Sequence, residues 1–276
     1  VTRGGRELAR RAIEVTPAPV EPGEIEVLPA PGLGLGPQDA VEVILDASGS
    51  MLQRQSGERR IEIAKRTLSE LVNDTIPPGT GFALRVFGNR EADACRTDLE
   101  VPLGPHDPAR ASAVIAGITA VNLAKTPIAR SIALSAQDLA GVGGSRVLIV
   151  VTDGEETCEG DPGQAIQTLR AQGVDIRVNI VGYAIDDAEL ARTFVSWARA
   201  GGGGYFDAAD ADELGAALRR AAAAPFEIRD DAGALVGAGL AGDAPVTVPA
   251  GSYAVRIGGR DLAAVVEPGA RTRVSP

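Results

Sequence analysis

The sequence predicts an α/β fold, in which a doubly wound, mostly parallel sheet carries helices on both faces and a small C-terminal β-sandwich-like domain follows. Between residues 40 and 224, short apolar runs alternate with segments whose apolar residues recur at helical spacing. Strands that alternate with helices form parallel sheets covered on both faces. From Pro225 onward, short strand-like runs are separated by Gly- and Pro-containing turns, and no helical period remains.

The expected elements of the α/β region come in a regular order. Strands are predicted at 40–46, 82–87, 96–103, 145–153, 174–183 and 203–206. Helices are predicted at 60–75, 108–118, 127–140, 162–173, 186–200 and 211–224. Pro127 stands where a first helical turn accepts proline, and Gly173 where a helix stops.

Three segments are expected along the chain. Residues 1–39 form a linker, with one short basic helix or strand in RELARRAIEV and one possible strand in GEIEV that joins the β domain. Residues 40–224 form the α/β domain. Residues 225–276 form the small β-sandwich domain, whose strands are expected in FEIRD, LVGAGL, VTVPAG, SYAVRI, LAAVV and RTRVS.

Composition narrows the possible partners. The chain has 276 residues, is 45% hydrophobic and carries a formal net charge of -10, which argues against nucleic acid or an anionic membrane as the main partner. No apolar run approaches the roughly 20 residues that cross a bilayer, so we expect no membrane contact by this segment itself. Because the chain opens on Val1, we expect a mature form or an excised piece.

The run VEVILDASGSM places a carboxylate and two hydroxyls, Asp46, Ser48 and Ser50, directly after a buried strand. Such residues often only form a turn or cap the next helix. Carboxylate and hydroxyl oxygens also suit Mg²⁺, Ca²⁺ or Mn²⁺. The pattern alone leaves both interpretations open.

Two further segments favour the metal. Thr126 lies just before a predicted helix, and Asp153 ends a second apolar strand in VLIVVTDGEET. In an open α/β sheet, ligands bind beyond the carboxyl ends of the strands, where the strand order reverses. Strands that both end in aspartate would direct Asp46 and Asp153 into one crevice.

The segments DASGSM, AKTP and TDGEET together resemble the von Willebrand factor type A (VWA) domain, over residues 40 to about 224. Asp46, Ser48, Ser50, Thr126 and Asp153 match the five positions of that family's metal-ion-dependent adhesion site (MIDAS). The resemblance implies that the three hydroxyls bind Mg²⁺, or else Mn²⁺ or Ca²⁺, directly. The aspartates would act through water or through the hydroxyls, and a partner protein would supply an Asp or Glu carboxylate to the ion.

Cys95 and Cys158, 63 positions apart, both lie in polar loops. Two buried free thiols are one reading; a disulfide and an oxidising compartment are the other. In the VWA fold the two loops emerge on the metal face, so a bridge there would brace the site. It would contribute on the order of 3 to 4 kcal/mol. The disulfide would imply an extracytoplasmic protein, whether secreted, periplasmic or surface-tethered. The chain also resembles bacterial secreted or membrane-tethered members of the family, in which cysteines occur in the same two loops.

We therefore expect a metal-dependent protein-binding or adhesion module rather than an enzyme. An accessory subunit of an ATPase-linked or transport assembly is the alternative. A metal-dependent hydrolase is a remote one, in which Glu155 and Glu156 at the rim of the site would activate water. His106, the single histidine, is expected in a surface loop, and Trp197 with Phe194 in the core. The GAGLAG run at 237–242 lacks the βαβ context of a dinucleotide site.

Overall fold

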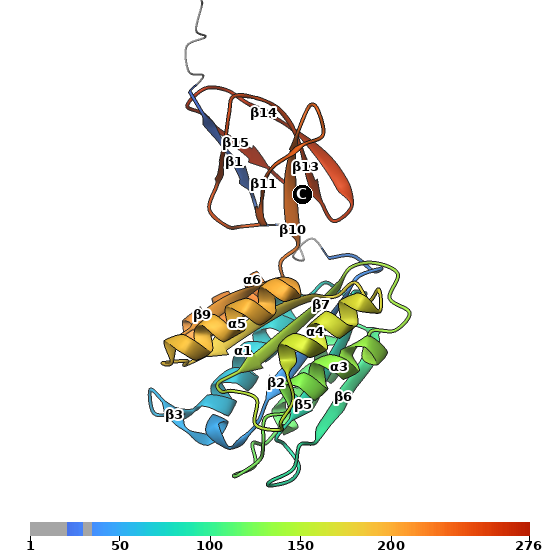
Figure 1. Ribbon diagram of the computed structural model, residues 1–276, viewed down its shortest axis with the longest axis vertical. Helices are drawn as coiled ribbons and strands as arrows, with labels where there is room; N and C mark the ends of the chain where they lie inside the picture. The colour runs from blue at the N-terminus through green and yellow to red at the C-terminus, as the bar shows by residue number, and fades with distance from the viewer. Residues whose placement is uncertain (1–20, 30–34) are drawn as a thin grey trace, which may run out of the picture.

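The computed structural model describes residues 21–29 and 35–276. Its centre is a six-stranded sheet in the order β6-β5-β2-β7-β8-β9 (Figure 1). β6 runs antiparallel to β5 and the other neighbours are parallel, which confirms the predicted mostly parallel sheet. The strands are β2 (Ala40–Asp46), β5 (Gly81–Phe87), β6 (Thr97–Pro105), β7 (Arg146–Thr152), β8 (Arg177–Tyr183) and β9 (Gly202–Ala208).

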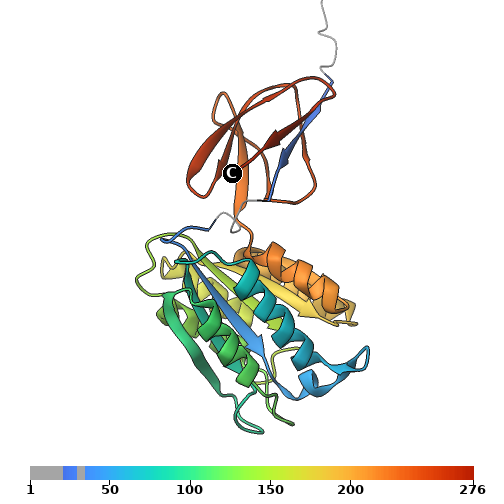
Figure 2. The same cartoon turned by 180° about the vertical axis from the view of Figure 1, so that it is seen from behind.

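Helices cover both faces of this sheet. One face packs on α1, α2 and α6, and the other on α3, α4 and α5, as the two opposite views show (Figures 1 and 2). Every residue of β2 is buried, as a strand between two helical layers requires. The helices are α1 (Arg60–Asp74), α2 (Pro108–Gly117), α3 (Ile128–Asp138), α4 (Pro162–Ala171), α5 (Ala188–Ala200) and α6 (Ala211–Ala222).

Aspartates fix the starts of four helices. The side chains of Asp107, Asp161, Asp187 and Asp210 each accept a hydrogen bond from a backbone N–H in the first turn of α2, α4, α5 and α6. α3 lacks such a local cap. A backbone N–H of its first turn instead donates to Glu156, which lies 27 positions further along the chain.

The C-terminal strands form a small second unit of two sheets. One sheet has the order β11-β10-β13-β14, and the other the order β12-β1-β15, with β1 (Gly23–Val27) antiparallel to β12 and parallel to β15. Ile25, Phe226, Ile228 and Val255 are among the residues of its core. Its other strands are β10 (Pro225–Asp230), β11 (Leu235–Leu240), β12 (Val246–Val248), β13 (Gly251–Ile257), β14 (Arg260–Val266) and β15 (Arg271–Val274).

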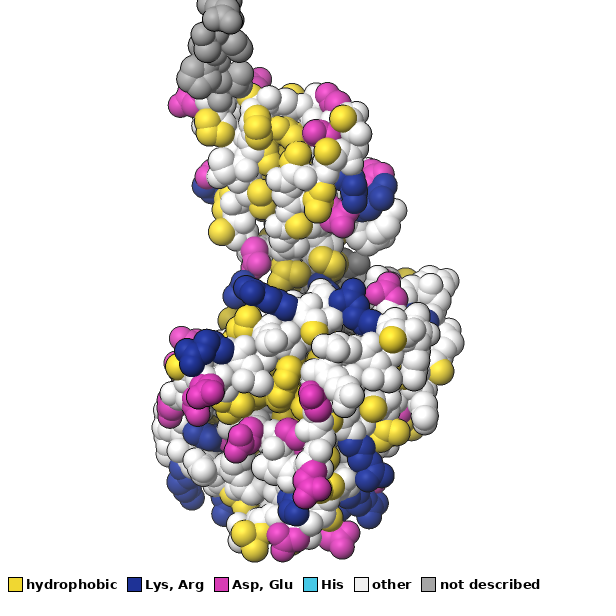
Figure 3. Space-filling view, in the orientation of Figure 1, with side chains coloured by type: hydrophobic (Ala, Val, Ile, Leu, Met, Phe, Trp, Pro, Cys, Tyr) yellow, Lys and Arg dark blue, Asp and Glu magenta, His cyan; other side chains and the backbone are white. Residues whose placement is uncertain are grey.

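The two units lie end to end. The arrowhead of β2 points away from the β unit, so the carboxyl edge of the large sheet lies at the far end of the molecule (Figures 1 and 2). Asp and Glu side chains are visible at that end, with Arg or Lys among them (Figure 3). The small unit therefore leaves the carboxyl edge open. No helix among the described residues is long and apolar enough to cross a membrane.

Some local predictions were wrong or incomplete. His106 is buried rather than in a surface loop: its Nε2 lies 2.6 Å from the carbonyl oxygen of Val72. That carbonyl belongs to the last turn of α1, where helical partners run out, so the imidazole satisfies it. The short pairing of β3 (Arg54–Gln55) with β4 (Glu58–Arg59) was not predicted. GAGLAG contributes to strand β11 and the turn after it, and the predicted segment RELARRAIEV lies outside the described residues.

Candidate metal centre

Asp46 and Asp153 lie at the same edge of the large sheet. Asp46 is the last residue of β2, and Asp153 follows directly after β7, which pairs with β2 in parallel. The helix after β2 packs on one face of the sheet and the helix after β7 packs on the other. The edge between the two strands is therefore the point at which the chain winds in opposite directions, where α/β sheets bind ligands.

A continuous chain of hydrogen bonds joins four of the five predicted site residues. The backbone N–H of Ser48 donates to Asp46 Oδ1 at 2.7 Å, and the oxygens Ser48 Oγ and Ser50 Oγ lie 3.0 Å apart. Ser50 Oγ donates to Asp153 Oδ1 at 2.5 Å. Because the Ser50 proton goes to Asp153, Ser48 is the donor within the serine pair.

The remaining two carboxylate oxygens are also bonded. Thr152 Oγ1 donates to Asp46 Oδ2 at 2.7 Å, and Arg60 Nη1 donates to Asp153 Oδ2 at 3.0 Å. Burial, and next the charge of Asp153, raise the pKa of Asp46 to about 7, against the lowering effect of the bonds from Ser48 and Thr152. Each of the four carboxylate oxygens thus already accepts a hydrogen bond from a protein donor.

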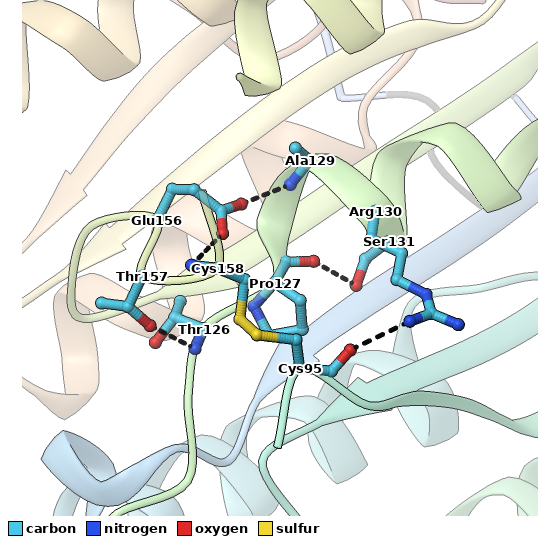
Figure 4. Close-up of a disulfide and its surroundings, with 9 residues drawn as sticks. All are labelled: Cys95, Thr126, Pro127, Ala129, Arg130, Ser131, Glu156, Thr157 and Cys158. Carbon is cyan, nitrogen blue, oxygen red and sulfur yellow. Dashed lines mark hydrogen bonds between the residues drawn. A yellow bond between two sulfur atoms is a disulfide. The ribbon is translucent and has the colours of Figure 1, made fainter. Parts of the chain in front are cut away.

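Thr126 lies on a neighbouring loop. The backbone N–H of Gly49 donates to the carbonyl oxygen of Ala124 at 3.4 Å, which places this loop against the serine turn. The backbone of Thr126 is bonded twice to Thr157. Its N–H donates to Thr157 Oγ1 at 2.7 Å (Figure 4). Its carbonyl oxygen accepts from the Thr157 N–H at 3.2 Å. Thr126 is buried, and its hydroxyl is not part of the hydrogen-bond chain of the serines.

A disulfide joins Cys95, in the loop between β5 and β6, to Cys158, in the loop after β7 (Figure 4). The predicted pairing is thus present in the structure. Beside it, Glu156 Oε1 accepts from the backbone N–H of Cys158, and Oε2 accepts from that of Ala129, each at 2.7 Å. Three loops of the carboxyl edge are therefore tied together next to Thr126.

These bonds change the role expected of Glu156. Both of its carboxylate oxygens are held by backbone N–H groups, so it does not offer a free base for activating water. Glu155 is exposed. His106 bonds to the C-terminal turn of α1, the end of that helix away from this edge.

An acidic hollow of about 610 Å³ adjoins the site on the side of α4 and α5. Trp197 is half-buried at this hollow, whereas Phe194 beside it is buried in the core as predicted. The charged residues that line it are Glu155, Glu156, Glu159, Asp161, Asp187 and Glu189.

The residues present fit a small divalent cation. Within the described residues, no three side chains of His, Cys, Asp or Glu form a metal cluster, so hydroxyls have to supply part of any ligand set here. In an octahedron with metal–oxygen distances of 2.0–2.1 Å, as Mg²⁺ requires, adjacent ligand oxygens lie about 2.9 Å apart. The observed separation of the Ser48 and Ser50 hydroxyl oxygens is 3.0 Å.

Sequence reasoning missed several contributors to this edge. Thr152 and Thr157 fix Asp46 and Thr126, and Arg60 pairs with Asp153. Thr152 could have been identified from the sequence, because it directly precedes Asp153 in TDGEET and so lies at the same edge of the sheet. The Arg60 pair had no sequence signal, because its partner lies 93 positions away.

Comparison with known proteins identifies the family to which this fold belongs. Residues 41–220 match the von Willebrand factor type A domain family. The chain is 37% identical over 187 residues to the uncharacterized protein YwmD of Bacillus subtilis strain 168, covering 63% of this chain and 80% of that protein.

Two solved structures share the fold. An aerotolerance-related membrane protein from Bacteroides fragilis has 23% identity and a TM-score of 0.52, covering 66% of this chain and 98% of that one. Proximal thread matrix protein 1 from the mussel byssus, with a zinc-occupied MIDAS motif, has 18% identity and a TM-score of 0.54, covering 67% of this chain and 44% of that one. The chain belongs to the von Willebrand factor type A domain family.

Proposed function

We propose that this protein is a divalent-metal-dependent protein-binding module whose ion accepts an Asp or Glu carboxylate from a partner. Asp46, Ser48, Ser50, Thr126 and Asp153 would form a complete MIDAS, with Mg²⁺ as the expected ion and Mn²⁺ or Ca²⁺ as substitutes. Domains of this family are commonly metal-dependent interaction modules. The related thread matrix protein with zinc in its MIDAS supports a divalent ion in this fold.

The main support for a metal ion here is the spacing of the Ser48 and Ser50 hydroxyls. Their 3.0 Å separation suits two adjacent corners of an octahedral ion, and the oxygens of Asp46 and Asp153 are already engaged by protein donors. The direct ligands would then be the neutral hydroxyls of Ser48, Ser50 and Thr126. An ion bound mainly by neutral oxygens keeps most of its charge and retains exchangeable water, which an incoming carboxylate can replace.

The same features favour binding over catalysis. Glu156 is held by two backbone N–H groups, and the histidine lies away from the site, so neither is placed as a base. The disulfide between Cys95 and Cys158 supports an oxidising, extracytoplasmic location.

Calorimetric titration of Mg²⁺ and Mn²⁺ into the protein tests the metal site. We expect binding by the wild-type protein and a loss of at least tenfold in affinity for Asp153→Asn, the scale typical of residues that orient metal ligands. Glu155→Gln is the matched control, because it removes the same charge two residues away at an exposed position. Equal affinity of all three proteins would refute the site.

Acetate can stand in for the partner carboxylate. Bound Mn²⁺ enhances the relaxation of water protons, and acetate that displaces a metal-bound water lowers this enhancement. We expect a saturable decrease with wild-type protein loaded with Mn²⁺. Unchanged relaxation would contradict an ion open to carboxylates.

A further inference from the structure

Arg60 forms an ion pair at the metal centre that the five-residue motif does not include. Arg60 is the first residue of α1, and its Nη1 lies 3.0 Å from Asp153 Oδ2. The Arg60 side chain is 12% exposed and that of Asp153 is 0% exposed. Pairs that are this well shielded from water are screened little, so the charge of Arg60 acts strongly on the site.

The pair also fixes the direction of the Asp153 carboxylate. Ser50 donates to its Oδ1 and Arg60 to its Oδ2, so each oxygen is held from a different side. The backbone N–H of Arg60 donates to the carbonyl oxygen of Gln53 at 2.9 Å, just after the serine turn. This bond anchors the start of α1 to that turn, and so places the Cα of Arg60, from which the side chain reaches Asp153, at a fixed position beside the serines.

Arg60 also changes the charge of the centre. In the metal-bound centre, with both aspartates ionised, Asp46 and Asp153 would contribute two negative charges, and Arg60 would offset one of them. A divalent ion then leaves a net charge of plus one, whereas without Arg60 it would leave zero. The attraction of the centre for a carboxylate depends on this difference.

We propose that Arg60 is a positioning residue that trades metal affinity for carboxylate affinity. It holds Asp153 back from direct coordination, so that the ion keeps an exchangeable water and a net positive charge for the partner. This inference rests on the proposed function and specifies how the same site is tuned. Without Arg60, Asp153 Oδ2 would lose its donor and could bind a divalent ion in place of one water.

Three variants test this role. Arg60→Gln removes the charge, and Arg60→Lys retains it. Lys65→Gln is the matched control, because Lys65 lies on the same helix, pairs with Glu62 and is 13% exposed. Mn²⁺ and Mg²⁺ affinity is measured by calorimetry, and the number of exchangeable waters on bound Mn²⁺ and its acetate affinity by water-proton relaxation. Circular dichroism and thermal unfolding check that each variant is folded.

We expect Arg60→Gln to change metal affinity and acetate affinity in opposite directions. Arg60→Gln should bind Mn²⁺ about three- to tenfold more tightly, since a like charge has been removed, yet bind acetate several-fold more weakly. One water on Mn²⁺ should be lost. Arg60→Lys and Lys65→Gln should resemble the wild type in both measurements. A merely structural role would weaken metal and acetate binding together.

Two results would overturn the inference in different ways. If the wild type binds metal but Arg60→Gln shows unchanged or weaker metal affinity, the role of Arg60 is refuted and the site stands. If the wild type binds neither ion, the proposed function itself is refuted and this inference fails with it.

Discussion

Glu156 Oε2 accepts a hydrogen bond from the backbone N–H of Ala129 at 2.7 Å, across 27 positions of sequence. Ala129 lies in the first turn of α3, which has no capping side chain of its own. Glu156 therefore serves as the N-terminal cap of the helix that begins just after Thr126. Its other oxygen bonds to Cys158, so one carboxylate connects the helix start to the disulfide loop.

Glu156→Ala should destabilise the protein by about 1 kcal/mol, the typical cost of losing an N-terminal cap, with a further loss from the helix dipole. Glu155→Ala, at the exposed neighbouring position, should change the free energy of unfolding little. Urea unfolding of both variants measures the difference. Equal effects of the two substitutions would contradict the capping role.

Reduction of the disulfide should lower the free energy of unfolding by about 3 to 4 kcal/mol, because the bridge closes a long loop in the unfolded chain. The bridged residues are 63 positions apart. Chemical unfolding with and without reductant measures the change, and the Cys95→Ser/Cys158→Ser double variant provides a reductant-free comparison. Two free thiols in the native protein under non-reducing conditions would rule out the bridge.

The sequence was informative where structure follows from periodicity and poor where it follows from distant contacts. The strands of the large sheet and the carboxyl-edge positions of Asp46 and Asp153 are readable, because buried parallel strands and their ends have local signatures. The pairing of Arg60 with Asp153 and of Glu156 with Ala129 joins positions 93 and 27 apart, which no local pattern encodes. The prediction of a surface position for His106 was wrong for the same reason, since the carbonyl oxygen that its imidazole contacts belongs to α1, 34 positions away.

Thr126→Val should reduce Mg²⁺ affinity by at least about tenfold. Of the three hydroxyls proposed to bind the ion, it removes the one that lies on the loop before α3 rather than in the serine turn. Valine keeps the shape of threonine, and the backbone bonds to Thr157 remain. Thr126→Ser retains the hydroxyl and should bind normally. Calorimetry on the three proteins measures the effect; unchanged affinity in Thr126→Val would remove Thr126 from the ligand set.

Glu42→Gln should flatten the pH dependence of stability. Burial, followed by the neighbouring Asp138, raises the pKa of Glu42 well above the usual value of 4.5, although Arg85 opposes the shift. The native state therefore holds this proton more tightly than the unfolded state. Its contribution to stability is complete below the usual glutamate pKa and is lost as the pH rises through the raised pKa.

Urea unfolding between pH 5 and pH 8 checks this sign. The wild type should lose more stability across the range than Glu42→Gln, while Glu62→Gln, on the exposed side of α1, should follow the wild type. Asp46 contributes in the same direction in every protein, so it cancels in the comparison. Parallel profiles for wild type and Glu42→Gln would contradict a raised pKa at Glu42.

Ile25→Ala should destabilise the small β unit and leave the VWA domain intact. Ile25 is fully buried in β1, between β12 and β15, although the whole of the large domain separates it from them in sequence. Removing a buried isoleucine side chain costs about 2 to 5 kcal/mol, which is large for a unit of this size. Hydrogen exchange should accelerate in residues 246–257 and 271–274 and stay unchanged in β7. Val265→Ala, at an exposed position of β14, is the control. Faster exchange throughout both units would instead mean that they unfold as one, and would contradict the division of the chain near residue 225.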